Sequence, residues 1–339
     1  MELFGAPHSV LGYCLVVLVG LLTLLGTAAA VLLLWPLRHR ALRDAPARSL
    51  DFTAATRAAE AVIAAEAADP QVRPECRSRL LSHGTRTGRV VLLLHGYTLG
   101  PDQYDRLARE FFSRGYNVWI PRAPRHGMVD RRAHHGVEAG ELTAYAAEAV
   151  NVAAGLGDEV GVVGISGGAV LATWLAQFRG DVVRRLLLLS PFFGPDPSQA
   201  PAFAVRPLIA LYGRGVLPDR INSRGYSFAA VSQYLRIVRN LPDPPRRTGL
   251  RTAAVAISPL DGVVDRTQAM ALPRRIAAAN GIPLGSWTLP ESSGVRHDIL
   301  ATASLGGGGS EFHRRYVALY EGDVEALSGP PAPFLPGTR

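Results

Sequence analysis

Val160–Thr173 reads VGVVGISGGAVLAT, and this stretch decides how the chain folds. Its first residues have the length of a buried strand, and those from Ala169 onward have helical character. Between them lies G-x-S-x-G centred on Ser166, which is the strand–turn–helix context of a nucleophile elbow. The stretch predicts a serine nucleophile beside a helix N-terminus that favours negative charge. A Gly/Ser-rich phosphate-binding loop is the alternative that this stretch alone leaves open.

Apolar runs and helical segments alternate on both sides of this turn. The expected strands are 89–94, 117–120, 160–163, 186–190, 252–258 and 286–289, and the expected helices are 51–68, 102–113, 138–156, 169–177, 267–279 and 311–327. This order predicts the α/β class, with a doubly wound, mostly parallel sheet covered on both faces. Ligands bind such sheets at the carboxyl ends of the strands, where His95, Ser166 and Asp261 stand.

The alternation is interrupted at about residues 194–250, which we interpret as an inserted cap. Its apolar patches, Ala202–Leu211 and Val231–Val238, are expected to shape an apolar pocket. The expected domains are therefore a transmembrane segment at 1–36, a basic linker with an Ala-rich helix at 37–76, the α/β domain at 77–327 and a Pro-rich tail at 328–339.

The N-terminal segment from Val10 to Trp35 carries no charge and exceeds the roughly 20 residues that cross a bilayer. We predict one uncleaved transmembrane helix; a cleaved signal peptide and a lipoprotein signal are the alternatives. Four arginines follow the segment and none precedes it, which predicts a cytoplasmic catalytic domain. These arginines are Arg38, Arg40, Arg43 and Arg48.

The net charge of +8 comes entirely from arginine in a chain without lysine. Because abundant arginine, alanine and glycine are typical of a coding bias, and because no nucleic-acid-binding motif accompanies the charge, we expect no nucleic-acid partner. Two cysteines, Cys14 and Cys76, are too few for a disulfide framework.

A serine nucleophile needs a base and an acid that orients the base, in the chain order serine, acid, histidine for this type of turn. His297 is the predicted base, because His313 lies in the last helix beside two arginines, where a solvated face is expected. Asp261 is the predicted acid, since Asp265 is placed to cap the next helix instead.

Donors for a developing oxyanion are predicted at the backbone N–H groups of Gly167 and Tyr97. His95 is expected to brace the loop before Tyr97. Three further histidines, His126, His134 and His135, precede the elbow and are separated by arginines that disfavour a cation, so no metal and no cofactor are expected.

From about Arg77 to Leu327 the chain resembles the α/β-hydrolase superfamily, most closely bacterial carboxylesterases and monoacylglycerol-lipase-like enzymes. The resemblance is carried by His95-Gly96-Tyr97-Thr98, Pro124-Arg125-His126-Gly127, Gly164-Ile165-Ser166-Gly167-Gly168, Asp261-Gly262-Val263-Val264 and Gly294-Val295-Arg296-His297. Two features depart from the family pattern: Ser258 stands where relatives often have glycine, and the N-terminal span is not a family feature.

The resemblance implies a membrane-anchored serine hydrolase that cleaves small or lipid-derived carboxylic esters through an acyl-enzyme on Ser166. A thioesterase, serine peptidase or acyltransferase with the same three residues is the alternative among enzymes. A catalytically silent binding protein of the same fold is the alternative outside enzymes.

Overall fold

The computed structural model describes residues 10–34, 36–300, 302–305 and 309–323. Within these residues, seven strands form one sheet in the order β1-β3-β2-β4-β5-β6-β7, and every pairing except that of β1 with β3 is parallel. The strands are β1 Arg79–Leu81, β2 Thr87–Leu94, β3 Asn117–Ile120, β4 Gly157–Ile165, β5 Val183–Leu189, β6 Thr252–Ile257 and β7 Leu284–Thr288. The predicted α/β architecture is confirmed.

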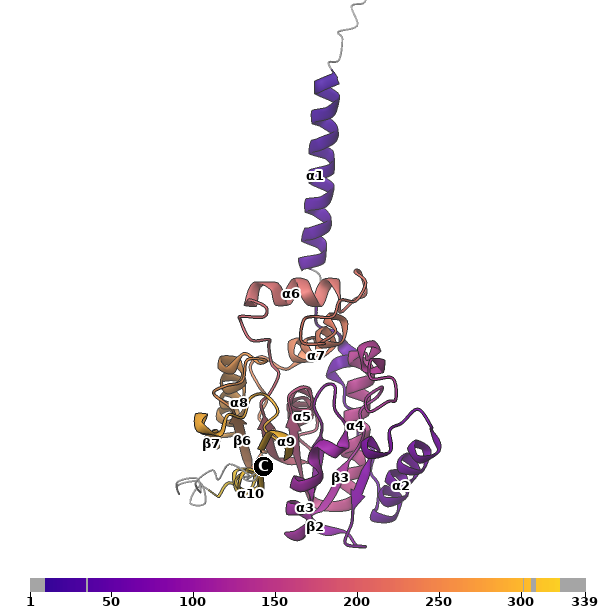
Figure 1. Ribbon diagram of the computed structural model, residues 1–339, viewed down its shortest axis with the longest axis vertical. Coiled ribbons are helices and arrows are strands. Elements are labelled where there is room, and N and C mark those ends of the chain that lie inside the picture. The colour runs from indigo at the N-terminus through magenta and orange to yellow at the C-terminus, as the bar shows by residue number, and fades with distance from the viewer. Residues whose placement is uncertain (1–9, 35, 301, 306–308, 324–339) are drawn as a thin grey trace, which may run out of the picture.

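Helices cover both faces of the sheet (Figure 1). The α-helices are α1 Val10–Leu34, α2 Phe52–Ala68, α3 Asp105–Ser113, α4 Ala139–Leu156, α5 Gly167–Phe178, α6 Ala202–Leu211, α7 Phe228–Asn240, α8 Arg266–Asn280, α9 Thr302–Leu305 and α10 Gly309–Glu321. Apolar side chains of α4, α5 and α8 pack in the core on one face, and those of α3 and α10 pack in the core on the other.

The continuous apolar run of β2 is explained by burial on both faces. Val90 and Leu92 pack in one core, while Val91 and Leu93 pack in the other, and all four are fully buried. Successive strand residues point to opposite faces, so a strand covered on both sides needs apolar residues at every position.

The segment predicted as a basic linker after the N-terminal helix packs against the rest of the chain. Leu42 lies in a short 3-10 helix, Arg40–Arg43, and is buried, and its carbonyl accepts a hydrogen bond of 2.8 Å from the indole Nε1–H of Trp174. Further on, α2 packs against α4. Residues 37–76 therefore belong to the folded body that carries the sheet.

Helix α1 extends away from that body as a single long rod (Figure 1). Its 25 residues span about 37 Å at 1.5 Å per residue, more than the thickness of a hydrocarbon core. The window Gly12–Val31 has a mean hydropathy of 2.5 and none of it is buried against the protein. By length and composition, α1 is able to cross a membrane.

The end of the chain differs from the prediction in one respect. The last helix was expected at 311–327, but α10 ends at Glu321, where Gly322 adopts a φ of +79° that breaks the helix. The expected Pro-rich tail at 328–339 lies outside the described residues.

Candidate active site

Ser166 occupies the sharp turn between β4 and α5. Its backbone has a φ of +53° and a ψ of −115°, a region that residues other than glycine rarely adopt and that costs about 1–3 kcal/mol. A Cβ on Gly168 would lie only 2.0 Å from the Leu94 carbonyl oxygen, and one on Gly164 would lie 2.3 Å from the Gly168 carbonyl oxygen. The two glycines therefore allow strand and helix to close around the serine.

His297 connects Ser166 to Asp261. Its Nε2 lies 2.9 Å from Ser166 Oγ, and its Nδ1 lies 2.8 Å from Asp261 Oδ2. The arrangement fits a tautomer in which Nδ1–H donates to the carboxylate and Nε2 accepts from the hydroxyl. The structure thus brings together the three residues that the sequence proposed as nucleophile, base and acid.

Asp261 is almost completely buried, with 2% of its surface exposed. Burial alone would raise the pKa of its carboxyl group, but the hydrogen bond from His297 and those from the Val263 and Val264 N–H groups outweigh it and lower the pKa overall. Oδ1 accepts the two backbone bonds at 2.8 and 3.3 Å, which leaves Oδ2 for His297. The carboxylate is therefore charged and fixed in orientation.

The neighbouring carboxylate has a different position. Asp265 caps the N-terminus of α8, where its Oδ1 accepts hydrogen bonds from the N–H groups of Thr267 at 2.9 Å and Gln268 at 3.1 Å. This is the position that the sequence proposed for it.

His313 is not on a solvated face, which corrects the sequence-based expectation. It is buried in α10, and its Nε2 lies 3.2 Å from the Leu300 carbonyl oxygen. The adjacent arginines suggested exposure, but the helix turns His313 inward, away from Ser166 and toward the loop that follows His297.

Ser258 connects the loop of the acid to the loop of the base. Its buried hydroxyl donates a short hydrogen bond to the Val295 carbonyl and accepts one of 3.0 Å from the Leu260 N–H. Val295 precedes His297 by two residues and Leu260 precedes Asp261 by one. The serine that departs from the family pattern thus ties together two segments whose spacing matters to the site.

The predicted oxyanion donors lie on two segments that approach Ser166. Tyr97 and Gly167 both line the cavity that contains Ser166. A Cβ on Gly96, the residue before Tyr97, would lie 3.6 Å from Ser166 Cβ, which shows how closely this loop approaches the serine. Gln103 holds the loop by accepting a 2.9 Å hydrogen bond from the Gly96 N–H.

His95 braces the same loop, in agreement with the role that the sequence suggested. Its Nδ1 lies 3.0 Å from the Gly96 carbonyl oxygen, and its Nε2 accepts a hydrogen bond of 2.9 Å from the Ala123 N–H. Burial lowers the pKa of His95 to about 4, so the ring is neutral, as these two contacts require.

The cavity over Ser166 has a volume of about 230 Å³. Its apolar wall comes from Phe192, Val231, Tyr234 and Val263. Of the two apolar patches that were expected to shape it, the one in α7 contributes only Val231 and Tyr234, and the one in α6 contributes nothing. This corrects the sequence-based expectation: α6 lines a different cavity.

An aromatic cluster behind this wall was not anticipated. The ring of Tyr97 contacts the rings of His126, His134, Tyr226 and Tyr234, with centroids 4.7–6.1 Å apart. The sequence gives no local signal for it, because its members come from four separate segments. Among the described residues, no group of three His, Cys, Asp or Glu side chains is arranged to hold a metal ion.

Comparison with known proteins identifies a family model and several similar structures. Residues 91–320 match the model of the alpha/beta hydrolase family. A metagenome-derived lipolytic enzyme from the study of LipS and LipT superimposes with a TM-score of 0.56 at 19% identity, covering 74% of this chain and 100% of that one. The monoacylglycerol lipase of Paleococcus ferrophilus gives 0.53 at 17% identity, covering 72% and 98%.

A third similar structure is Est1E from Butyrivibrio proteoclasticus with bound ferulic acid, which gives a TM-score of 0.53 at 13% identity and covers 75% of this chain and 96% of that one. Identities at this level show a common fold and no more. Comparison with curated protein sequences finds no significant match.

Proposed function

This chain is a member of the alpha/beta hydrolase family, and from that premise we propose that it is a membrane-anchored serine hydrolase that cleaves carboxylic esters. One observation carries the proposal: hydrogen bonds connect the serine, the histidine and the aspartate in series. His297 Nε2 lies 2.9 Å from Ser166 Oγ, and His297 Nδ1 lies 2.8 Å from Asp261 Oδ2. The lipases and esterases of the same fold agree with ester hydrolysis as the general chemistry.

In the proposed acylation step, His297 Nε2 takes the proton of Ser166 as Oγ attacks the ester carbonyl carbon. The charge of Asp261 stabilises the imidazolium that forms, and its hydrogen bond keeps Nδ1 protonated. The backbone N–H groups of Tyr97 and Gly167 are the proposed donors to the oxyanion, assisted by the N-terminus of α5.

His297 then returns the proton to the departing alcohol, which leaves an acyl group on Ser166. In the second half-reaction the same Nε2 takes a proton from water, the hydroxide attacks the acyl carbon, and the Ser166 proton is restored. The apolar wall of Phe192, Val231 and Tyr234 supports an apolar acyl group as the part of the substrate that lies in the cavity.

The test uses the full chain in neutral detergent micelles with p-nitrophenyl esters and a fluorophosphonate probe, which labels only an activated serine. Ser166→Ala is expected to abolish labelling and to lower hydrolysis about 10³-fold or more. Ser190→Ala is the control, because Ser190 is also buried and its hydroxyl has no hydrogen-bond partner among the described residues. Hydrolysis that persists in folded Ser166→Ala protein would overturn the assignment.

We also propose that α1 anchors the enzyme and that the folded body, from about residue 37 onward, lies on the cytoplasmic side. Arg38, Arg40, Arg43 and Arg48 follow the helix, while no arginine or lysine precedes it. Protease added outside the inner membrane of permeabilised cells is expected to leave the hydrolase intact. Digestion without lysis of that membrane would show the opposite orientation.

A further inference from the structure

A second cavity lies where α1 meets the cap. It has a volume of about 540 Å³ and shares no lining residue with the cavity over Ser166. Its lining comes from three loops, which follow α1, β5 and α7, and from the helices α6, α7 and α8. The buried part of the lining is apolar, with Phe193, Val205, Leu235 and Leu241 among its residues.

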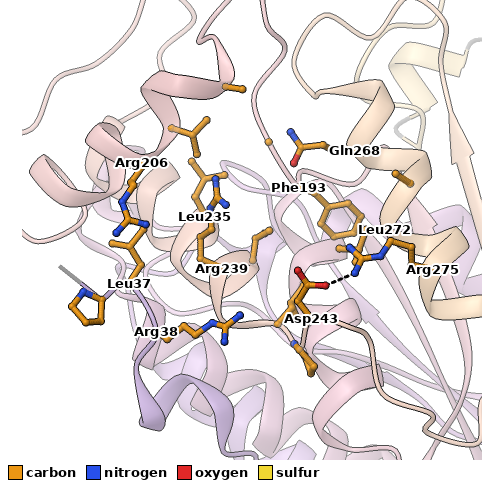
Figure 2. A pocket seen from close by; sticks show the side chains of 18 residues that line it. Leu37, Arg38, Phe193, Arg206, Leu235, Arg239, Asp243, Gln268, Leu272 and Arg275 are labelled. Atoms are coloured by element: carbon orange, nitrogen blue, oxygen red, sulfur yellow. Dashed lines mark hydrogen bonds and ion pairs between the residues drawn. The ribbon is translucent and has the colours of Figure 1, made fainter. Parts of the chain in front are cut away.

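The rim of this cavity is basic. Four exposed arginines line it, Arg38, Arg206, Arg239 and Arg275, against a single acidic residue, Asp243. Figure 2 shows Arg38, Arg206 and Arg239 on the side of Leu37, and shows Arg275 across the cavity in an ion pair with Asp243. An apolar interior with guanidinium groups at its rim is complementary to a molecule with an anionic head and an apolar tail.

Hydrogen bonds fix the mouth of the cavity to the exit of the membrane helix. Helix α1 ends at Leu34, and Pro36 and Leu37 already line the cavity. The Arg214 guanidinium donates to the Pro36 carbonyl at 2.8 Å, and the Asn240 side chain donates to the Leu37 carbonyl at 3.1 Å. Two hydrogen bonds therefore connect the cap to the point where the chain leaves α1.

The cap also presents apolar surface on the same side. Helix α6 lies across the lower end of α1 (Figure 1), and Phe203 on this helix is 82% exposed. A large aromatic side chain that is exposed in water but adjacent to a membrane helix is suited to the interface between headgroups and acyl chains. Both features place the cavity mouth at the height of lipid headgroups.

We propose that this cavity binds one anionic phospholipid of the membrane that α1 spans, with the phosphate among the rim arginines and one acyl chain in the apolar interior. This inference rests on the membrane anchoring proposed above, but not on the proposed esterase activity. A free phosphate ion does not use the apolar interior and a zwitterionic lipid does not match the rim charge, so the two features together select an anionic lipid.

The experiment measures binding of a fluorescent, ether-linked phosphatidylglycerol, which an esterase cannot cleave, to the full chain in neutral detergent micelles. Saturable binding of one lipid per chain is expected. Unlabelled phosphatidylglycerol should displace it, whereas phosphatidylcholine and inorganic phosphate should not. The affinity should fall about tenfold or more in Arg38→Gln/Arg239→Gln, at roughly 1 kcal/mol for each arginine near the headgroup.

Two matched controls separate this site from general attraction to charge. Arg57→Gln/Arg109→Gln removes the same charge from exposed positions on α2 and α3 and should bind normally. Ala271 is exposed on α8 and lines the cavity, so Ala271→Trp should block lipid binding. Ala278 is exposed on the same helix but does not line the cavity, so Ala278→Trp should bind lipid normally.

Equal loss in both arginine pairs, equal displacement by phosphatidylcholine, or displacement by inorganic phosphate would each overturn the lipid site. Co-flotation of the full chain with phosphatidylcholine vesicles tests the premise separately. A chain that floats but does not prefer phosphatidylglycerol retains its anchor and disproves the lipid site, whereas a chain that does not float disproves both. Fluorophosphonate labelling reports on the esterase independently of either result.

Discussion

The cavity over Ser166 and the cavity beside α1 lie one after the other along a single helix. In α7, Val231 and Tyr234 line the cavity over Ser166, and Leu235, Val238 and Arg239 line the cavity beside α1. In the first cavity, polar atoms are held by directional hydrogen bonds, as between Ser166 Oγ and His297 Nε2. The second has exposed arginines around an apolar interior.

This difference follows from what each cavity is proposed to do. Proton transfer and oxyanion stabilisation require atoms placed to within a few tenths of an ångström, so their groups stand at strand ends and helix starts that the core holds rigid. Attraction of an anionic amphiphile requires only charge and apolar area, which flexible arginines on helix surfaces provide. The predictions below use matched substitutions to separate the two.

The largest effect is expected in the loop after β6, where Asp261 contacts His297 and Asp265 caps α8. Asp261→Asn should lower kcat about 10³- to 10⁴-fold, because the amide no longer holds His297 in the tautomer that accepts the Ser166 proton. Asp265→Asn is the matched control: asparagine caps helices as well as aspartate does. Steady-state kinetics and thermal unfolding of both variants test this.

Neither substitution is expected to change binding of ether-linked phosphatidylglycerol. Asp261 does not line the second cavity, and asparagine at position 265 still caps the N-terminus of α8. A fall in kcat of similar size in both variants would mean that the loop acts as a unit and that Asp261 has no separate role. A fall in lipid affinity for Asp261→Asn alone would show that the two cavities are coupled.

The sequence predicted which segments meet around Ser166 because its signals are local. A strand, a G-x-S-x-G turn and a helix identify Ser166, and the order of the following strands identifies the loops of Asp261 and His297. Asp265 followed from its spacing to the next helix, and the structure finds it at the cap. Each of these depends on residues a few positions apart, where local backbone rules apply.

What the sequence could not supply depends on packing between distant segments. The patch Val231–Val238 has helical spacing, but its sequence does not indicate that its first residues line one cavity and its later residues another. The docking of Leu42 beneath Trp174 joins segments more than a hundred residues apart. His313 was misjudged for the same reason: its two arginine neighbours suggested a solvated face, but His313 and Arg315 are both buried by packing with distant segments.

An intermediate effect is expected from enlarging the two half-buried valines of α7. Val231→Trp should reduce the space over Ser166 and shift preference toward esters of shorter acyl chains, by about tenfold or more in the ratio of kcat/KM values, the discrimination that one methylene gives in an apolar pocket. Val238→Trp should leave that ratio unchanged and weaken lipid binding, because this residue lines the second cavity.

A series of p-nitrophenyl esters of increasing chain length measures the first effect, and the phosphatidylglycerol titration measures the second. If Val238→Trp changes acyl preference as strongly as Val231→Trp does, the two cavities form one substrate channel, and the division of α7 proposed here is wrong.

The smallest effect is expected from pH, and it should act on the catalytic side alone. Burial lowers the pKa of His126 to about 3, with the nearby His95 as the next cause, and burial lowers the pKa of His134 to about 4, with His126 as the next cause. His126 Nε2 lies 3.4 Å from the Tyr234 hydroxyl, so this cluster supports the wall of the cavity over Ser166. Among the residues that the structure describes, no histidine lines the second cavity.

The sign follows from the protons that each state binds. Between the ordinary histidine pKa of about 6.5 and the lowered folded values, the unfolded chain binds protons that the folded chain does not. The stability is therefore fully present above about pH 6.5 and is lost as the pH falls, by at most about 1.4 kcal/mol per pH unit for each such histidine.

His126→Phe should reduce the slope of this loss by the contribution of one histidine. The affinity for ether-linked phosphatidylglycerol should stay nearly constant over the same pH range. Denaturant unfolding of the full chain in micelles from pH 7 to pH 4.5 measures the slope. An unchanged slope in His126→Phe would show that His126 takes up its proton in the folded state as readily as in the unfolded chain, and that the aromatic cluster does not hold it neutral.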